Sequence, residues 1–537
     1  MLTLEPTDNR VKPVFKDATT CAKWLSQLQL TNLNLAHGTL RTQIDLFNLL
    51  PMRGKERLRT LETLREMVGI VQADFAKKLV GKKLPLSDDE FTSLISLSNL
   101  WISMYNGYLR CLESLDAGDS SLAAETALIC QRCLLYSGLQ IGEFLRAGHV
   151  PDGKSWQRFH STYAHIEANG LQQEPVTDSL NHTSRVCSRT LYAKTLLLHR
   201  ARLLGMRRNQ WPTLNRWLDS WGETFTFETS CSMSHEDAPP LAVDLAGSGG
   251  LIPIYQATSA AGMRFLAMVP LSKLIRVKTI LLQQGQLPQH LDLGEDMNSQ
   301  DCINLLNRLH ACWCEKRAES MADEPRSAPE VKLCSSVEYI YAHIAGKPFK
   351  QPTPSSIADK EEQKQIETFG RVLDQTDRHN LAQLGFLAEE WLVEEDGLLH
   401  ARLLRKLNSG ERLGMNQIVC VHKPEGIIYK LGVVTVTSVT RTGQLYIGVR
   451  YLPGQPRTAI VRGTPSGNLL SGAAPALILP EIASMRIPPS IVIPRDWFGT
   501  GRRLELSTKE VPKLEISLGI SVEKGHDFER VSYLPAN

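Results

Sequence analysis

Two groups of cysteine and histidine residues are spaced closely enough along the chain to suggest metal binding or thiol chemistry. Cys130 and Cys133 form a C-x-x-C pair, and His310 is closely followed by Cys312 and Cys314. The C-x-x-C pair lies in an apolar segment of helical periodicity, without a second pair at zinc-binding spacing. On a helix, Cys312 and Cys314 would point about 200° apart, so one metal ion could not easily bind both. We therefore predict buried structural thiols at both places and no metal site.

The sequence also lacks the common signatures of nucleotide-dependent and hydrolytic enzymes. It has no Walker loop, no dinucleotide-binding fingerprint and no H-E-x-x-H motif. The glycine-rich run at 247–250 is not followed by Lys and Ser or Thr, so we expect a loop and not a phosphate cradle. His235, Glu236 and Asp237 could serve an enzyme, but they precede two prolines and are better explained as a solvated loop. We predict that the chain is not an enzyme and needs no cofactor.

A run of positive charge between residues 185 and 217 could attract an anion. Tyr192, Trp211 and Trp217 lie among these charges, as in proteins that stack single-stranded nucleic acid. In the alternative, the cations pair with acids on neighbouring helices and the aromatic residues belong to the core. We favour this alternative because no helix-turn-helix spacing accompanies the run. The eight positive residues are Arg185, Arg189, Lys194, Arg200, Arg202, Arg207, Arg208 and Arg216.

The composition is that of a globular protein large enough for several domains. Of 537 residues, 42% are hydrophobic and 22% are charged, and this length allows roughly three or four domains. The 60 Lys and Arg against 57 Asp and Glu leave a net charge of only +3, which does not call for nucleic acid or an anionic membrane as a partner. The 11 scattered cysteines indicate reduced thiols, and no apolar run is long enough to span a membrane. We expect a cytoplasmic protein.

Hydrophobic periodicity divides the chain into a helical half and a strand-rich half. Apolar residues recur every three or four positions from 19 to 218, and the period becomes two after 384, where ten short apolar runs alternate with turns. We therefore expect a multi-domain α+β protein whose C-terminal part holds an antiparallel β-barrel and further strands. The expected parts are a helical domain at 1–220, a mixed α+β domain at 221–346, a linker at 347–370, a β-barrel at 371–462 and a C-terminal β extension at 463–537.

The order of motifs between residues 371 and 451 resembles a PilZ domain. Trp391 and the run EEDGLLH at 394–400 are followed by NQIVCVH at 416–422, KLGVV at 430–434 and YIGVRY at 446–451. The whole chain is also similar in layout to large proteobacterial proteins with a long helical N-terminal region and a PilZ-like barrel near the C-terminus. The resemblance implies a six-stranded barrel and binding of the second messenger cyclic di-GMP.

The resemblance also implies which residues would bind this ligand. PilZ domains clamp the phosphates and stack on guanine with two arginines in R-x-x-x-R, since a guanidinium can do both. Here the corresponding arm carries Arg371 and Arg378, seven positions apart where the motif has four. Arg402 and Arg405, at or just after the second strand, could supply replacement phosphate contacts, although strand arginines are more often solvated.

A second PilZ motif, D/N-x-S-x-x-G, offers hydrogen bonds to the base and a close approach of the backbone. Counted from Trp391, it falls on Glu395, Gly397 and His400, so the acid is longer, the serine hydroxyl is lost and the glycine is replaced. The chain therefore departs from both parts of the ligand signature.

These observations lead to a functional hypothesis. We expect a non-enzymatic bacterial regulatory or adaptor protein with a degenerate PilZ-like domain, which senses cyclic di-GMP and relays it to a protein partner through the helical region. The partner's identity does not follow from the sequence. The second hypothesis is a nucleic-acid-associated protein that uses the basic stretch at 185–216 and binds with strong salt dependence.

Overall fold

A computed structural model shows that the chain folds into two compact units. One, called the helical unit below, comprises Met1–Lys82 and Leu86–Asp323, and the other, the barrel unit, comprises Lys83–Pro85 and Glu324–Asn537. None of the described helices is both long and apolar enough to cross a membrane. The residues that the structure describes are 4–178, 183–206, 210–231, 238–258, 260–315, 328–351, 381, 383–424, 428–463, 472–511 and 513–536.

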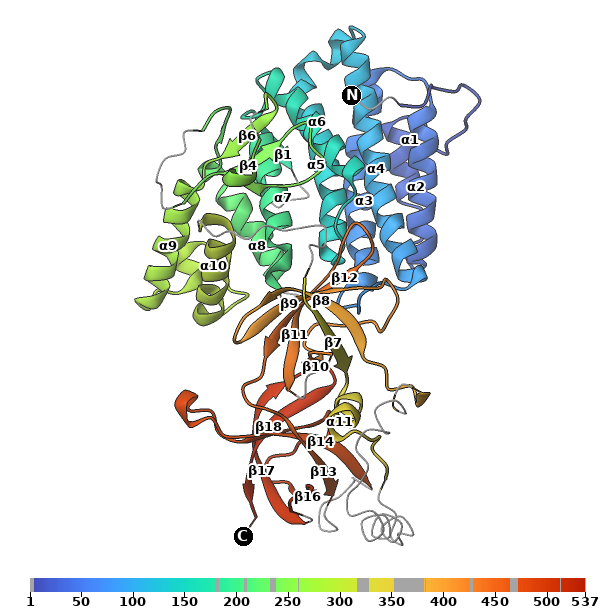
Figure 1. The fold of residues 1–537 in the computed structure, drawn as a ribbon. Helices are drawn as coiled ribbons and strands as arrows, with labels where there is room; N and C mark the ends of the chain where they lie inside the picture. The colour runs from blue at the N-terminus through green and yellow to red at the C-terminus, as the bar shows by residue number, and fades with distance from the viewer. Residues whose placement is uncertain are drawn as a thin grey trace. The chain divides into compact units, whose positions relative to one another are not determined.

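The helical unit begins with six α-helices and continues with short strands and further helices (Figure 1). A four-stranded antiparallel sheet has the strand order β3-β6-β4-β5, and β1 and β2 form a separate hairpin. The helices are α1 (Ala18–Leu25), α2 (Leu33–Leu49), α3 (Gly54–Ala76), α4 (Asp88–Asp116), α5 (Thr126–Arg146), α6 (Gly153–Ala168), α7 (Ser188–Ala201), α8 (Gln210–Ser220), α9 (Val269–Gln283) and α10 (Ser299–Cys314). The strands are β1 (Pro175–Asp178), β2 (Thr183–Cys187), β3 (Phe227–Glu228), β4 (Leu241–Asp244), β5 (Ile252–Pro253) and β6 (Met263–Leu266).

Local sequence explains where the long helix α4 begins. The Ser87 hydroxyl accepts a hydrogen bond from the Glu90 amide, and the Glu90 carboxylate accepts one from the Ser87 amide at 3.0 Å. This capping box satisfies amides that have no partner within the helix, and the acidic first turn complements the positive end of the helix. The helix therefore begins at Asp88, with Ser87 as its N-cap.

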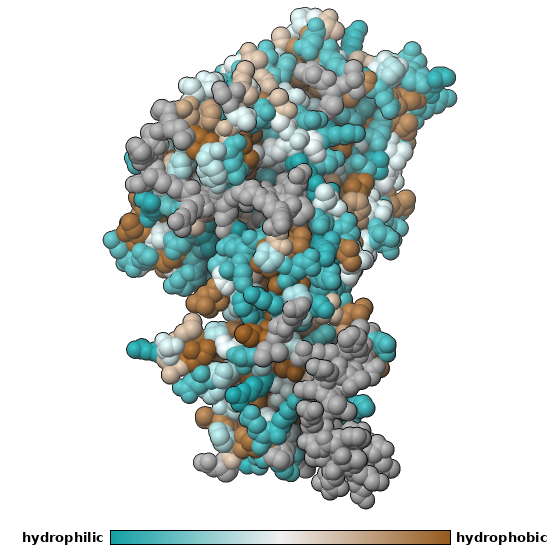
Figure 2. Space-filling model, viewed as in Figure 1, coloured by the Kyte–Doolittle hydropathy of each residue, from teal (hydrophilic) through white to brown (hydrophobic). Residues whose placement is uncertain are grey.

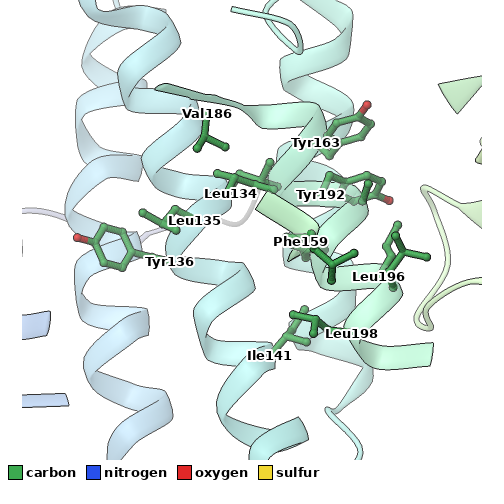
Figure 3. Packing of buried hydrophobic residues seen from close by; sticks show 14 of the residues in the cluster. Leu134, Leu135, Tyr136, Ile141, Phe159, Tyr163, Val186, Tyr192, Leu196 and Leu198 are labelled. Carbon is green, nitrogen blue, oxygen red and sulfur yellow. The ribbon is translucent and has the colours of Figure 1, made fainter. Parts of the chain in front are cut away.

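One large hydrophobic core joins most of the helical unit, and a smaller cluster that includes Phe75 and Leu94 is separate from it. The large core extends from Phe15 to Cys314. Figure 3 shows the part of this core that lies between α5, α6 and α7, where Leu134, Phe159 and Tyr192 are among the labelled residues. The indole of Trp313 on α10 donates a hydrogen bond to the Leu197 carbonyl oxygen on α7 at 3.2 Å. The expected boundary between residues 220 and 221 therefore falls inside a continuous core, because buried residues of α9 and α10 belong to the same cluster and α10 packs against α7. On the face drawn in Figure 2, apolar residues lie scattered among hydrophilic ones.

The barrel unit holds two closed six-stranded antiparallel barrels, which confirms the expected fold class. The first has the order β10-β11-β12-β9-β8-β7 and the second the order β13-β14-β15-β18-β17-β16. The strands of the first barrel are β7 (Glu330–Ser335), β8 (Glu389–Asp396), β9 (His400–Arg405), β10 (Ile418–His422), β11 (Tyr429–Val439) and β12 (Leu445–Tyr451), with α11 (Val337–Ala345) after β7. Those of the second are β13 (Arg457–Gly463), β14 (Ala473–Leu479), β15 (Ser490–Pro494), β16 (Arg503–Ser507), β17 (Leu514–Lys524) and β18 (Phe528–Pro535).

The barrels differ from the expected domain boundaries in two ways. The strand β7, expected within the mixed domain at 221–346, pairs with β8 and with β10 and so closes the first barrel. The expected linker at 347–370 is thus an insertion between two strands of one barrel, and its residues 352–370 lie outside the described residues. The expected β extension at 463–537 is a complete second barrel whose first strand begins at Arg457.

The thiols provide a test of this packing. All eleven cysteines are free, and eight are buried, Cys130 and Cys133 among them as predicted. Burial raises the pKa of the Cys130 thiol to about 12, which leaves almost no reactive thiolate at neutral pH. We expect iodoacetamide to modify the half-buried Cys187, Cys231 and Cys312 first in the folded protein, as measured by mass spectrometry of its peptides. Rapid modification of Cys130 before denaturation would contradict this packing.

Candidate functional site

Three of the residues that the sequence singled out meet at the end of the β8–β9 hairpin. Glu395 on β8 lies opposite Arg402 on β9. Its carboxylate is 3.0 Å from Nε2 of His400 and 3.3 Å from Nη1 of Arg402. The three side chains are between 27% and 59% exposed, so a ligand could reach them. The Glu395 carboxylate here holds two basic side chains, which differs from the hydrogen-bonding role that the PilZ motif gives to this position.

Gly397 has a structural reason to be glycine. It lies in the turn between β8 and β9, where its amide donates a hydrogen bond to the His400 carbonyl oxygen at 2.7 Å. A Cβ atom at Gly397 would lie 2.9 Å from Cε1 of His400, so the exposed His400 ring would have to move away from its position over the turn. The glycine therefore allows the His400 ring to fold back over the turn toward Glu395. It does not replace the serine of the PilZ motif chemically.

Arg405 lies inside the first barrel and not on its surface. Because side chains alternate along a strand, Ala401, Leu403 and Arg405 on β9 are all buried, and Arg405 is 1% exposed. Its Nε is 3.0 Å from the Glu389 carboxylate, and its guanidinium carbon lies 5.0 Å from the centre of the Trp391 ring. Burial lowers the pKa of Arg405, against the raising effect of Glu389. The structure therefore separates Arg405 from the surface cluster of Glu395 and Arg402.

The two arginines of the expected arm, Arg371 and Arg378, lie outside the described residues. The same holds for His235, Glu236 and Asp237, the residues that could serve an enzyme. Their roles stay predictions.

The basic stretch at 185–216 does not form the cationic surface that the second hypothesis requires, as far as the structure describes it. Lys194 and Asp219 form a buried ion pair at 2.8 Å, and the Arg200 guanidinium, 2% exposed, donates to the Cys312 carbonyl oxygen at 3.0 Å. Arg216 forms an ion pair with Asp296. Arg189 and Arg202 are half-buried, Arg185 is exposed, and Arg207 and Arg208 lie outside the described residues.

Two of the three aromatic residues of that stretch are not available for stacking on bases. Tyr192 and Trp217 are at most 1% exposed, and Trp211 packs against the same core. The rings of Tyr192 and Tyr163 stack on each other with centroids 3.8 Å apart. Among the described residues, helices α7 and α8 use most of these charges and rings to attach to neighbouring elements, which favours the structural alternative over nucleic-acid binding.

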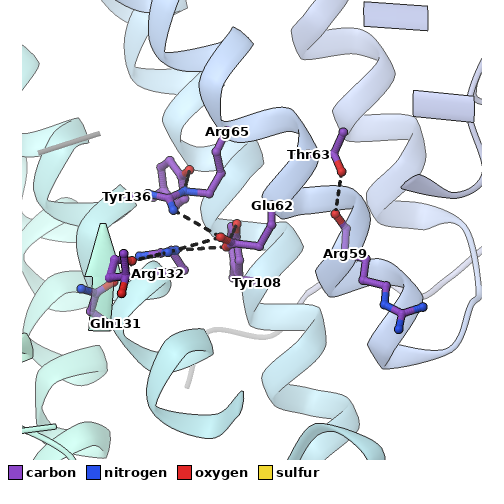
Figure 4. Close-up of polar contacts among 9 residues, drawn as sticks. Arg59, Glu62, Thr63, Arg65, Tyr108, Gln131, Arg132 and Tyr136 are labelled. Carbon is purple, nitrogen blue, oxygen red and sulfur yellow. Dashed lines mark hydrogen bonds and ion pairs between the residues drawn. The ribbon is translucent and has the colours of Figure 1, made fainter. Parts of the chain in front are cut away.

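A second place with ligand-binding geometry was missed by the sequence analysis. Arg65 on α3 and Arg132 on α5 are both nearly buried and share the carboxylate of Glu62 (Figure 4). They line an open pocket of about 470 Å³ in the helical unit. A signal was present in the sequence, since Arg132 lies in the middle of the apolar helical run ALICQRCLLYSG. A charged residue at such a position is rarely buried unless it is paired with an opposite charge.

Comparison with known proteins places both ends of the chain in one family. The family model described as "Cyclic-di-GMP receptor FimW, N-terminal domain" matches residues 19–232, which run from α1 to the strand β3. The model described as "FimW C-terminal beta-barrel domain" matches residues 460–535, which form most of the second barrel. No match was found among curated proteins or among solved structures. Since the two matches occur in domain order and together cover more than half of its length, the chain belongs to the FimW family.

Proposed function

We propose that this protein is a non-enzymatic receptor for cyclic di-GMP that passes the signal to a protein partner. The observation that carries the proposal is the match of residues 19–232 to the N-terminal domain of a cyclic-di-GMP receptor family, together with the match of 460–535 to that family's barrel domain. The six-stranded first barrel, with its PilZ-like order of motifs, supports the same ligand. The eleven free cysteines support a cytoplasmic location, where this second messenger acts.

The binding residues that we propose combine the arm with the β8–β9 hairpin. Arg371 and Arg378 would hold the two phosphates and stack on the guanine bases. Arg402 is the described arginine best placed to help them, because it is partly exposed and its partner Glu395 is itself accessible to solvent. A phosphate bound to Arg402 would compete with Glu395 for the guanidinium. Arg405 would support the barrel without touching the ligand, since it is buried.

The signal would be passed on through the segment that carries Arg371 and Arg378. Ligand bound by both the arm and the hairpin would attach that segment to the first barrel, and this change would alter what the helical unit presents to a partner. Such a switch can be shifted only by the difference in ligand affinity between its two states. The degenerate motifs therefore lead us to expect a weaker switch than an intact PilZ arm would give.

The proposal predicts that Arg378→Ala weakens cyclic di-GMP binding by at least about tenfold, the scale of one lost charge-assisted hydrogen bond. Isothermal titration calorimetry of the full-length protein measures the effect. Arg10→Ala is the matched control, because Arg10 is 91% exposed and pairs only with Asp8 among the ion pairs of the described residues. Equal affinities of wild type and Arg378→Ala for cyclic di-GMP would show that Arg378 does not contribute to binding. A folded wild-type protein that binds no cyclic di-GMP would refute the receptor function.

A further inference from the structure

Two buried arginines converge on one glutamate between helices α3 and α5 (Figure 4). The Glu62 carboxylate lies 3.0 Å from Nε of Arg132 and 3.3 Å from Nη1 of Arg65. The Arg132 and Arg65 side chains are 2% and 5% exposed, whereas that of Glu62 is 31% exposed. The glutamate thus lies on the solvent side of the two guanidinium groups.

The neighbouring groups hold the arginines in place. Arg132 donates to the Gln131 side-chain oxygen at 2.6 Å and to the Thr177 carbonyl oxygen at 2.9 Å, which ties α5 to the strand β1. Arg65 donates to the Tyr136 hydroxyl at 3.2 Å, and the Tyr108 hydroxyl donates to Glu62 at 2.6 Å. Burying charged groups is costly unless they are paired and hydrogen-bonded, and this shell supplies those bonds. The positions of both guanidinium groups are therefore fixed before any ligand arrives.

Charge interactions in this cluster are strong. Two buried guanidinium groups face the partly exposed Glu62 carboxylate from the interior, where the dielectric is low. Burial would raise the pKa of Glu62, but the hydrogen bond from Arg132 and the charges of both arginines outweigh it and hold this pKa below its ordinary value. Glu62 is therefore ionised at neutral pH and occupies the position at which an anion is most stable.

A pocket opens directly onto this cluster. It has a volume of about 470 Å³. This is within the range of about 300 to 1,000 Å³ that small-molecule sites occupy. Leu128, Pro175 and Val176 form part of an apolar wall, and Thr177 contributes a polar edge. Glu125 is the second acid of the lining, and it is exposed to solvent.

We propose that this pocket binds a small molecule that carries a phosphate group. The phosphate would bind to the guanidinium groups of Arg65 and Arg132. In the absence of the ligand, the Glu62 carboxylate occupies this position, and the phosphate would displace it. Planar guanidinium groups match phosphate oxygens in pairs, and a phosphate with two negative charges interacts with two cations more strongly than a single carboxylate does. The apolar wall would take the less polar part of the ligand. This site is separate from the arm and hairpin proposed above for cyclic di-GMP.

The experiment measures binding of inorganic phosphate and of GMP to the full-length protein by equilibrium dialysis. We expect saturable binding to the wild type, binding at least about tenfold tighter to Glu62→Gln, which removes the competing charge, and binding at least about tenfold weaker to Arg65→Gln. Arg59→Gln is the matched control on the same helix, since Arg59 is 64% exposed and does not line the pocket. Thermal unfolding of each variant establishes that it is folded.

Glu62→Gln keeps the proposal falsifiable even if Arg65→Gln fails to fold, because a gain of binding requires a folded pocket. A purely structural network predicts that neither phosphate nor GMP binds to any of the variants, and that outcome would overturn the proposal. Equal binding to Arg59→Gln, Glu62→Gln and wild type would overturn it as well, since the ions would then be held by general surface charge.

A titration with cyclic di-GMP separates this site from the proposed receptor site. Affinity that falls in Arg378→Ala and is unchanged in Arg65→Gln supports two sites, with a free phosphate or mononucleotide in the pocket. Affinity that falls in Arg65→Gln and is unchanged in Arg378→Ala supports the pocket with cyclic di-GMP as its phosphate source, and it refutes the arm. Phosphate binding that depends on Glu62 and Arg65, without any cyclic di-GMP binding, supports the pocket and refutes the receptor function.

Discussion

Replacing Arg405 by alanine is expected to lower the free energy of unfolding of the barrel unit by about 3–5 kcal/mol, the cost of breaking a buried ion pair. Arg405 is 1% exposed, and its loss would leave the Glu389 carboxylate, 19% exposed, without its cation. The Trp391 ring would lose the guanidinium that lies against it, and the Glu411 carbonyl oxygen would lose a donor. Urea denaturation, with hydrogen exchange of the β8 and β9 peptides to locate the effect, measures the change.

Arg402→Ala is the matched control on the same strand. Its ion pair with Glu395 has side chains 27% and 40% exposed, so its loss should cost no more than about 1 kcal/mol. The two substitutions thus distinguish the arginine that supports the barrel from the one that a ligand can reach. Similar destabilisation by both, or none by Arg405→Ala, would contradict the placement of Arg405 inside the barrel.

Trp313→Ala is expected to destabilise the helical unit by about 3–5 kcal/mol, the usual cost of truncating a fully buried aromatic residue. Trp313 on α10 is 0% exposed and its indole is bonded to the Leu197 carbonyl oxygen on α7. Because one core joins the first helices to α9 and α10, we expect hydrogen exchange to become faster in α7 as well as in α10.

Val277→Ala on α9 is the control for this experiment. Val277 is 53% exposed, so the substitution should change the free energy of unfolding by no more than about 0.5 kcal/mol. Faster exchange of α10 alone after Trp313→Ala, with α7 unchanged, would show that residues after 220 form a domain of their own. That result would support the domain boundary that the sequence predicts between residues 220 and 221.

The elements were more predictable than the way they join. Each of the ten apolar runs after residue 384 overlaps a strand, because alternation with a period of two is a local property of the chain. The strand β7 was not recognised as part of the first barrel because it pairs with β8 and β10 across long stretches of sequence, and pairing over such distances leaves no local pattern. The continuous core of the helical unit could not be predicted for the same reason, since the sequence around Trp313 does not indicate that this residue contacts α7.

The candidate sites show a similar limit. The sequence named Glu395 and Arg402 separately as candidate ligand contacts, without placing them side by side on one hairpin as the structure does. It could not show that Arg405 points inward, since an arginine on a strand is usually solvated and only the register of β9 decides its side. Arg65 and Arg132 are far apart in sequence, and only the packing of α3 against the neighbouring helices places them on one carboxylate.

The most direct test of the receptor function is isothermal titration calorimetry of the full-length wild-type protein with cyclic di-GMP, with GMP as the comparison ligand. We expect saturable heat with micromolar or tighter affinity for cyclic di-GMP, and weaker binding of GMP, which has one phosphate and one base. The absence of saturable heat with cyclic di-GMP, from protein shown to be folded by its thermal unfolding, would contradict the receptor function.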